Sequence, residues 1–222
     1  MGKHAGRKKR YLVAAIIATI AISVALYNAQ QSDSYKNSKI WNFDSQENIL
    51  DASIHTGSPG QTWVIKSDEL APSRPNVLAK VSGDESSTYH IKILPVGEAA
   101  SSSKSSVKFK IIPGQNEQTA GLLIRFQDSS HYFVLAADAL NNRFSLCRAE
   151  SDRIICTQDV NINVTTNVWH TITAQVSKQG IAGYLDDKLL IQRYDHHYIS
   201  GQVGVWAKGN SEAYFDDLKI DY

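Results

Sequence analysis

Apolar and polar residues alternate over the middle of the chain, and the alternation predicts a run of four antiparallel strands across residues 119–158. The first two strands are predicted at 121–126 and 131–138, with a polar turn between them. Side chains alternate across a strand, so pairing Ile124 with Phe133 gathers the apolar residues on one face. A slip of one residue would invert every face, so the agreement of the strands on one register favours this assignment.

The dipeptide Asn141-Asn142 predicts the next turn, because asparagine tolerates the positive φ angles of two-residue hairpins. This turn places Ala137 opposite Leu146 and continues the apolar face. The other face then carries a set of mostly polar side chains: Arg125, Tyr132, Asp138, Ser145 and Gln158.

The two cysteines of the chain fall in the same stretch. If Ser151-Asp152 is a two-residue turn, Cys147 lies opposite Cys156 at a non-hydrogen-bonded position, where side chains approach most closely. That separation favours a cross-strand disulfide. The alternative is a pair of reduced, half-buried thiols.

The start of the chain has a different pattern. Residues 1–10 are basic with no acidic residue, and residues 11–26 carry no charge. This order is typical of a cleaved signal peptide or an uncleaved signal anchor. Residues 11–29 just reach the roughly 17–20 apolar residues that a spanning helix needs. We therefore expect an N-terminal hydrophobic helix within residues 1–29 that anchors the chain, with cleavage and secretion as the alternative.

The position of the basic residues predicts the orientation of this anchor. Lysines and arginines before a spanning helix stay in the cytoplasm, so the rest of the chain is expected outside the cell membrane. Residues 30–39 are polar and are predicted to form a tether. Residues 40–222 are predicted to form one globular domain. An extracellular location also favours the disulfide, and Asn163 begins an Asn-Val-Thr glycosylation sequon.

Charge narrows the choice of partner. The whole chain has 23 basic and 22 acidic residues, and five of the basic residues lie in residues 1–10. The remainder therefore has a net charge of −4. A mildly acidic domain without a basic cluster is a poor candidate for nucleic-acid binding.

The rest of the domain contains many short alternating segments separated by Gly, Pro, Asn and Asp, which predicts an all-β sandwich or barrel. Beyond the N-terminal segment, no long stretch has helical periodicity. Trp206 is out of phase with Val203 and Val205, so we expect it to be the exposed tryptophan.

Three stretches carry a resemblance to a known superfamily. They are FKIIPGQNEQTAGLLIRFQDSSHYFVLAAD, VWHTITAQVSKQGIAGYLDDKLL and GQVGVWAKGNSEAYFDDLKI. Together they resemble the concanavalin A-like lectin/glucanase superfamily. The nearest patterns are laminin-G-like jelly rolls and the 3-keto-disaccharide hydrolase domain, which is related to glycoside hydrolase family 16. The resemblance implies a two-sheet antiparallel jelly-roll sandwich whose concave face commonly binds glycans.

With this resemblance, the polar face of the central strands becomes a candidate carbohydrate-binding surface made of Arg125, Tyr132, Asp138, Ser145 and Gln158. Guanidinium and carboxylate groups hydrogen-bond hydroxyls, and a tyrosine ring stacks on a sugar. The alternative is an ordinary solvated face. A further hypothesis is that the domain outside the membrane is a structural or protein-binding ectodomain.

Catalysis has less support. The Glu-x-Asp-x-x-Glu motif that supplies the two carboxylates of family 16 glucanases is absent. The disaccharide-hydrolase pattern has an acidic residue in the corresponding stretch, but His131–Leu135 of this sequence has none. We therefore expect a binding module without catalysis, with a hydrolase or lyase acting on modified (keto-) glycosides as the alternative.

We expect no cofactor and no metal. His196 and His197 are adjacent and would face apart on a strand. Asp216 and Asp217 are expected to serve as hydrogen-bond acceptors, with a structural Ca²⁺ as the alternative.

Overall fold

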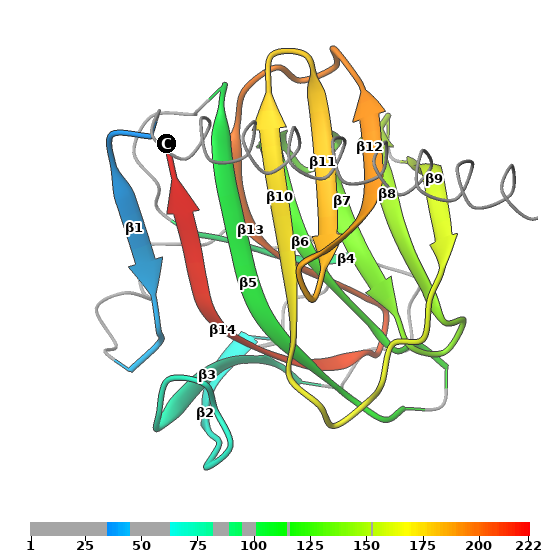
Figure 1. The fold of residues 1–222 in the computed structure, drawn as a ribbon. Coiled ribbons are helices and arrows are strands. Elements are labelled where there is room, and N and C mark those ends of the chain that lie inside the picture. The colour runs from blue at the N-terminus through cyan, green and yellow to red at the C-terminus, as the bar shows by residue number, and fades with distance from the viewer. Residues whose placement is uncertain (1–34, 45–62, 82–88, 95–100, 115, 152) are drawn as a thin grey trace, which may run out of the picture. The chain divides into compact units, whose positions relative to one another are not determined.

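The computed structural model describes residues 35–44, 63–81, 89–94, 101–114, 116–151 and 153–222. The described residues form fourteen strands and no helix, arranged in two antiparallel sheets (Figure 1). The expected all-β, two-sheet sandwich is confirmed. The predicted N-terminal helix lies outside the described residues. Among the described residues, no helix is long and apolar enough to cross a membrane.

The larger sheet has eight strands. In spatial order they are β12 (Lys188–Tyr194), β11 (Gly180–Leu185), β10 (His170–Ser177), β5 (Ser103–Ile112), β14 (Glu212–Asp221), β3 (Asn76–Lys80) and β2 (Trp63–Ser67), with β1 (Ser38–Trp41) paired to β14. β1 begins at Ser38, within the residues predicted to form the tether.

The second sheet has six strands and contains the predicted central run. In spatial order they are β4 (Tyr89–Ile93), β13 (Gln202–Lys208), β6 (Thr119–Asp128), β7 (His131–Asp138), β8 (Arg143–Glu150) and β9 (Arg153–Asn161). Hairpins join β6 to β7, β7 to β8 and β8 to β9, so residues 119–158 form the four-stranded meander that the alternation predicts.

The main core lies between the two sheets. Ile124 and Phe133 from the six-stranded sheet pack in one cluster with Phe109 and Phe215 from the eight-stranded sheet. Ile124 lies opposite Phe133, as the pattern predicts. Removal of these side chains from water supplies the main favourable contribution to folding.

The second hairpin differs from the expectation in its loop length. Ala137 lies opposite Phe144, and Asp138 opposite Arg143, so the loop has four residues instead of two. The predicted pair of Ala137 with Leu146 is wrong by two positions. A shift of two preserves the alternation, so both Phe144 and Leu146 still face the core.

The predicted polar face of the meander is mainly a second apolar cluster. Tyr132 and Trp206 are only 1% and 3% exposed, and they pack with Leu123, Val134 and Phe126. Trp206 is out of phase with the core, as expected, but it is buried and stacks on Tyr89 with ring centres 5.3 Å apart. Its predicted exposure is wrong. The alternation predicts the correct face for Trp206. Whether a side chain on that face is buried depends on packing, which alternation does not predict.

Candidate functional site

The five residues predicted to form the ligand surface do not form one open face. Arg125, Tyr132, Asp138 and Ser145 are buried and Gln158 is half-buried. Burial raises the pKa of Tyr132 to about 12.

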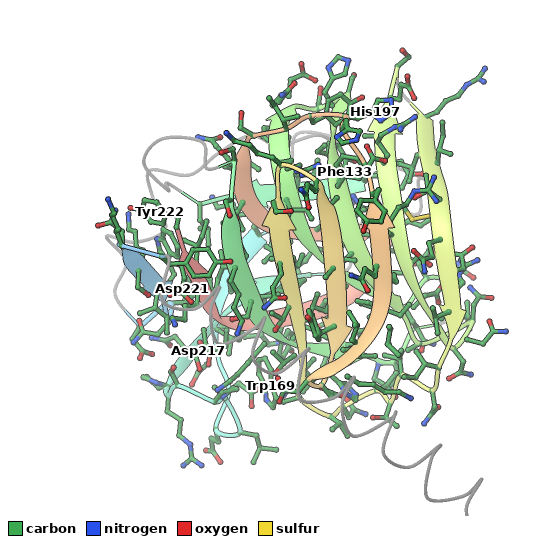
Figure 2. The ribbon with its side chains drawn as sticks, turned by 45° about the horizontal axis from the view of Figure 1, so that its top comes forward. Phe133, Trp169, His197, Asp217, Asp221 and Tyr222 are labelled. Atoms are coloured by element: carbon green, nitrogen blue, oxygen red, sulfur yellow. A yellow bond between two sulfur atoms is a disulfide. The ribbon has the colours of Figure 1, made fainter. Side chains whose placement is uncertain are left out.

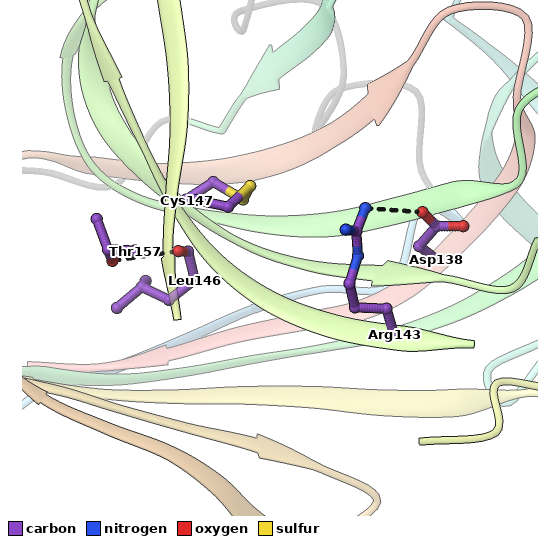
Figure 3. The surroundings of a disulfide bond; sticks show 6 residues. Asp138, Arg143, Leu146, Cys147 and Thr157 are labelled. Atoms are coloured by element: carbon purple, nitrogen blue, oxygen red, sulfur yellow. Dashed lines mark hydrogen bonds and ion pairs between the residues drawn. A yellow bond between two sulfur atoms is a disulfide. The ribbon is translucent and has the colours of Figure 1, made fainter. Parts of the chain in front are cut away.

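Asp138 has a local role at the β7–β8 loop. Its carboxylate accepts hydrogen bonds from the Asn141 amide at 3.0 Å and the Asn141 side chain at 2.8 Å. It also contacts Arg143 at 3.4 Å, as Figure 3 shows. An aspartate that binds the backbone a few residues ahead stabilises a turn. The geometry therefore assigns Asp138 to loop formation.

A bulge in β9 moves Gln158 to the other face of the sheet. Cys147 lies opposite Cys156, as the turn at Ser151 predicts, but the register then shifts and Leu146 lies opposite Gln158. Thr157 is the extra residue, and its hydroxyl contacts the Leu146 carbonyl at 3.3 Å (Figure 3). Leu146 faces the core, so Gln158 lies on that face as well.

The sulfur atoms of Cys147 and Cys156 form a disulfide, with an S–S distance of 2.06 Å. The bond joins β8 to the edge strand β9, next to the bulge. Asn163, the predicted glycosylation residue, is exposed in the connection that follows β9.

Arg125 shows the largest departure from the expected geometry. Its backbone has a φ of 51°, and the register of β6 and β7 shifts between Ile124 and Asp128. The expected Arg125–Tyr132 pair is therefore not formed. The positive φ turns the side chain toward the eight-stranded sheet, where the guanidinium donates to three carbonyl groups. These belong to Ser177 (2.6 Å), His197 (3.2 Å) and Asp195 (3.3 Å).

These contacts tie the two sheets together at one end of the sandwich. Ser177 ends β10 in the larger sheet, and Asp195 and His197 lie in the connection from β12 to β13. Arg125 is 2% exposed. Burial lowers its pKa, and the charge of Asp195 acts in the opposite direction. A guanidinium remains charged in this setting because its ordinary pKa lies far above neutral pH.

Around this buried cation lies a group of polar side chains that we call the Tyr198 cluster. Its members are Asp128, His131, Arg148, Glu150, Asp195, His197 and Tyr198. They come from the β6–β7 hairpin, the end of β8 and the β12–β13 connection, and Figure 2 shows His197 and Phe133 together at this end of the sandwich.

Tyr198 lies between two imidazoles. Its ring centre is 5.4 Å from that of His131 and 6.2 Å from that of His197, and both pairs meet edge to face. The hydroxyl donates to the Ala149 carbonyl at 3.0 Å. Tyr198 has a φ of 47°. Strained backbone of this kind at a bulky residue occurs often at binding and catalytic sites.

Each imidazole is oriented by a carboxylate. His131 Nδ1 lies 2.8 Å from both oxygens of Asp128, and His197 Nδ1 lies 2.8 Å from Asp195 Oδ1. With Nδ1 held, the Nε2 atom of each ring is left for another partner. The side chains of His131 and His197 are 42% and 54% exposed.

Arg148 completes the charge pattern of the cluster. It pairs with Glu150 at 2.6 Å, contacts His197 Nδ1 at 3.0 Å and lies 3.8 Å from Asp195. Burial would raise the pKa of Asp195, but hydrogen bonds from the amide and ring of His197 and the charge of Arg148 together lower it. Asp195 therefore stays ionised at neutral pH.

The sequence alone did not reveal this cluster. Its members come from three separate segments, and the pattern places His131 at the start of a strand and His197 beside His196, with no signal that His131 and His197 lie close together. The one available signal was Arg125, which was predicted as a site residue but on the wrong face.

Asp216 and Asp217 bind a different part of the chain. A bulge follows Asp216, and Asp217 has a φ of 45°, so the two carboxylates do not simply face apart. Asp216 accepts a hydrogen bond from the Ser73 amide at 2.7 Å. Asp217 accepts one from the Ser73 hydroxyl and pairs with Lys108 at 2.8 Å. They therefore accept hydrogen bonds, as predicted. Among the described residues, no group of three or more His, Cys, Asp or Glu side chains is arranged to hold a metal ion.

No protein-family model and no curated protein matches the sequence. The structure is similar to the carbohydrate-binding module CBM66 from Bacillus subtilis, with a TM-score of 0.59 and 14% identity over 72% of this chain and 96% of that one. It is also similar to a β-glucanase from Bacillus licheniformis, with a TM-score of 0.57 and 10% identity over 84% of this chain and 98% of that one.

A third similar structure is domain 4 of AbnA, a GH43 extracellular arabinanase from Geobacillus stearothermophilus, in complex with arabinotriose. Its TM-score is 0.51, with 12% identity over 86% of this chain and 84% of that one. At such low identity these similarities establish the fold and nothing further. The described residues share the two-sheet antiparallel sandwich fold of these structures.

Proposed function

We propose that this domain is a carbohydrate-binding module and that the Tyr198 cluster is its ligand surface. The observation that carries the proposal is the convergence of exposed imidazoles and carboxylates around one half-buried aromatic ring. Sugars suit this combination, because their hydroxyls exchange hydrogen bonds with such groups while their C–H faces contact an aromatic ring. The fold supports the proposal, since CBM66 and the arabinanase domain share it.

Arg125 acts in this proposal as a positioning residue. Its guanidinium donates to the carbonyls of Asp195 and His197 and so fixes the segment that carries the ligand-contacting side chains. Rigid presentation lowers the ordering cost of binding. Tyr132, Asp138 and Ser145 are buried in the sheet and are not assigned a ligand contact.

We place binding ahead of hydrolysis because the sequence lacks the paired-carboxylate motif of family 16 glucanases. We further propose that residues 11–29 anchor the chain, so that the domain is displayed outside the cell membrane, where polysaccharides occur. Fractionation of cells that express the full chain tests the anchor. Recovery of the protein in the medium with a shortened N-terminus would replace the anchor with a cleaved signal peptide.

The ligand surface is tested by affinity electrophoresis and calorimetry with arabinan, xylan and β-glucan. We expect His197→Ala and Tyr198→Ala to weaken binding about tenfold or more, which corresponds to a loss of about 1.4 kcal/mol. His196→Ala is the matched control, because this exposed neighbour takes part in none of the contacts of the cluster.

A third variant separates the two candidate surfaces. Tyr132→Phe removes only a hydroxyl from the buried outer face, so it should bind like the wild type. Loss of binding in Tyr132→Phe with full binding in His197→Ala would place the ligand on the outer face of the six-stranded sheet instead. If no polysaccharide binds and crosslinking captures a protein, the domain is a protein-binding ectodomain and the proposal fails.

A further inference from the structure

Thr165, His170 and Asp186 lie in a hydrogen-bonded row at the other end of the sandwich. His170 Nδ1 is 2.7 Å from Asp186 Oδ2, and His170 Nε2 is 2.8 Å from the Thr165 hydroxyl. Figure 2 shows Trp169, the neighbour of His170, at the end of the domain away from His197. The Tyr198 cluster uses none of these residues.

The order of groups in this row is that of an activated nucleophile. Such a site needs a hydroxyl within hydrogen-bond reach of a base, and a third group that orients the base. With Nδ1–H donated to Asp186, Nε2 is the acceptor for the Thr165 hydroxyl proton. When Nε2 is protonated, it can donate to the Thr165 carbonyl, 3.1 Å away.

Asp186 is held in place by its turn. Asp186 and Asp187 have φ angles of 48° and 62°, as a two-residue hairpin between β11 and β12 requires. The second carboxylate oxygen of Asp186 accepts the Thr171 amide at 2.8 Å. The orienting group is therefore fixed by the backbone at two points.

Thr165 is presented by an anchored segment. Val164 is 3% exposed in the main core, and the Asn167 amide donates to the Ile111 carbonyl at 2.8 Å. Between these two anchors Thr165 itself is exposed, whereas the side chain of His170 is only 11% exposed. A small molecule can reach the hydroxyl while the base stays sheltered from water.

We propose that Thr165, His170 and Asp186 form a nucleophilic site that accepts an acyl group from small esters. The Thr165 oxygen attacks the ester carbonyl as its proton passes to His170 Nε2. The bond from the carbonyl carbon to the alcohol oxygen breaks, and the alcohol leaves with that proton. Water then attacks the acyl-threonine with the same base, which releases the carboxylic acid and restores the hydroxyl.

The test follows p-nitrophenol release from p-nitrophenyl acetate by the full chain, with intact and peptide mass spectrometry to locate an acetyl group. We expect acetylation at Thr165 and at least a tenfold lower rate in Thr165→Val. Thr165→Ser should retain activity, and Asp186→Asn should slow it. Thr166→Val is the matched control, because it removes the neighbouring hydroxyl, which lies outside the row.

Equal rates in the wild type and Thr165→Val would overturn the proposal, as would a wild-type rate no higher than that of buffer. In either case the row is a structural bracket between the β9–β10 connection and the β11–β12 turn. Urea unfolding of each variant shows whether a lost rate reflects lost structure. Should Thr165→Val unfold, Thr165→Ser and the site of acetylation in the wild type decide the question.

Discussion

The Arg125 guanidinium lies over the Phe133 ring, with 5.8 Å between its central carbon and the ring centre. Simple alternation places these two side chains on opposite faces of the sheet, because Ile124 is the residue opposite Phe133. The positive φ at Arg125 removes this separation. One backbone angle therefore converts a predicted surface residue into a buried link between the two sheets.

We expect Arg125→Met to lower the free energy of unfolding by about 3 kcal/mol. The variant keeps an apolar side chain over Phe133 but leaves three carbonyl groups without their donor. Urea unfolding of the full chain measures the change. Arg143→Met is the control, because that side chain is 41% exposed and makes one 3.4 Å ion pair. It should cost less than about 1 kcal/mol. Equal losses in both variants would contradict a structural role for Arg125.

Gly201→Ala should disrupt the same link between the sheets, because Gly201 packs against the backbone of Arg125 and Phe126. A Cβ on Gly201 would lie 2.3 Å from the Arg125 carbonyl carbon and 2.6 Å from the Phe126 amide nitrogen. Backbone atoms cannot rotate away, so either the bulge or the β12–β13 connection must move. We expect a stability loss above about 2 kcal/mol and weaker polysaccharide binding. Gly114→Ala, whose Cβ would meet one backbone oxygen at 3.2 Å, is the milder comparison.

Much of the fold could be predicted because the strands of the meander alternate strictly. The register of Ile124 with Phe133 and of Cys147 with Cys156 follows from counting outward from turns. Two of the predictions that fail, those for the faces of Arg125 and Gln158, lie where extra residues enter a strand, in β6 at Arg125 and in β9 at Thr157. A bulge changes which face a side chain occupies without leaving a mark in hydrophobic periodicity. The candidate site depends on one of these bulges, so it was not predictable from alternation.

Trp206→Ala should be as costly as a substitution in the main core, about 3–5 kcal/mol. The indole is 3% exposed and packs on Tyr89, although it lies on the side of its strand that faces away from the opposite sheet. Tyr194→Ala removes an aromatic ring that is 79% exposed and should change stability by less than about 0.5 kcal/mol. Thermal unfolding compares the two. A small effect of Trp206→Ala would show that the outer cluster contributes little to the fold.

Asp216 should make the stability of the domain depend on pH. The side chain is 0% exposed, and burial raises its pKa to about 7, against the hydrogen bonds from the Ser73 and Asp217 amides. The nearby charges of Asp217 and Asp44 raise the pKa further. In the unfolded chain the pKa of this carboxyl group returns to its ordinary value of 3.8. Between these two values the folded protein binds a proton that the unfolded chain has already lost.

The stability that Asp216 contributes is therefore complete below about pH 3.8 and decreases as pH rises to about 7. From pH 5 to pH 8 the free energy of unfolding should fall by roughly 2–3 kcal/mol through this group alone. Asp216→Asn cannot ionise, so this fall should disappear in urea titrations over the same range. Asp159→Asn, which changes an exposed carboxylate on β9, should retain it. A wild-type curve that rises with pH while that of Asp216→Asn stays flat would mean that Asp216 is stabilised in its charged form, and the burial argument would be wrong.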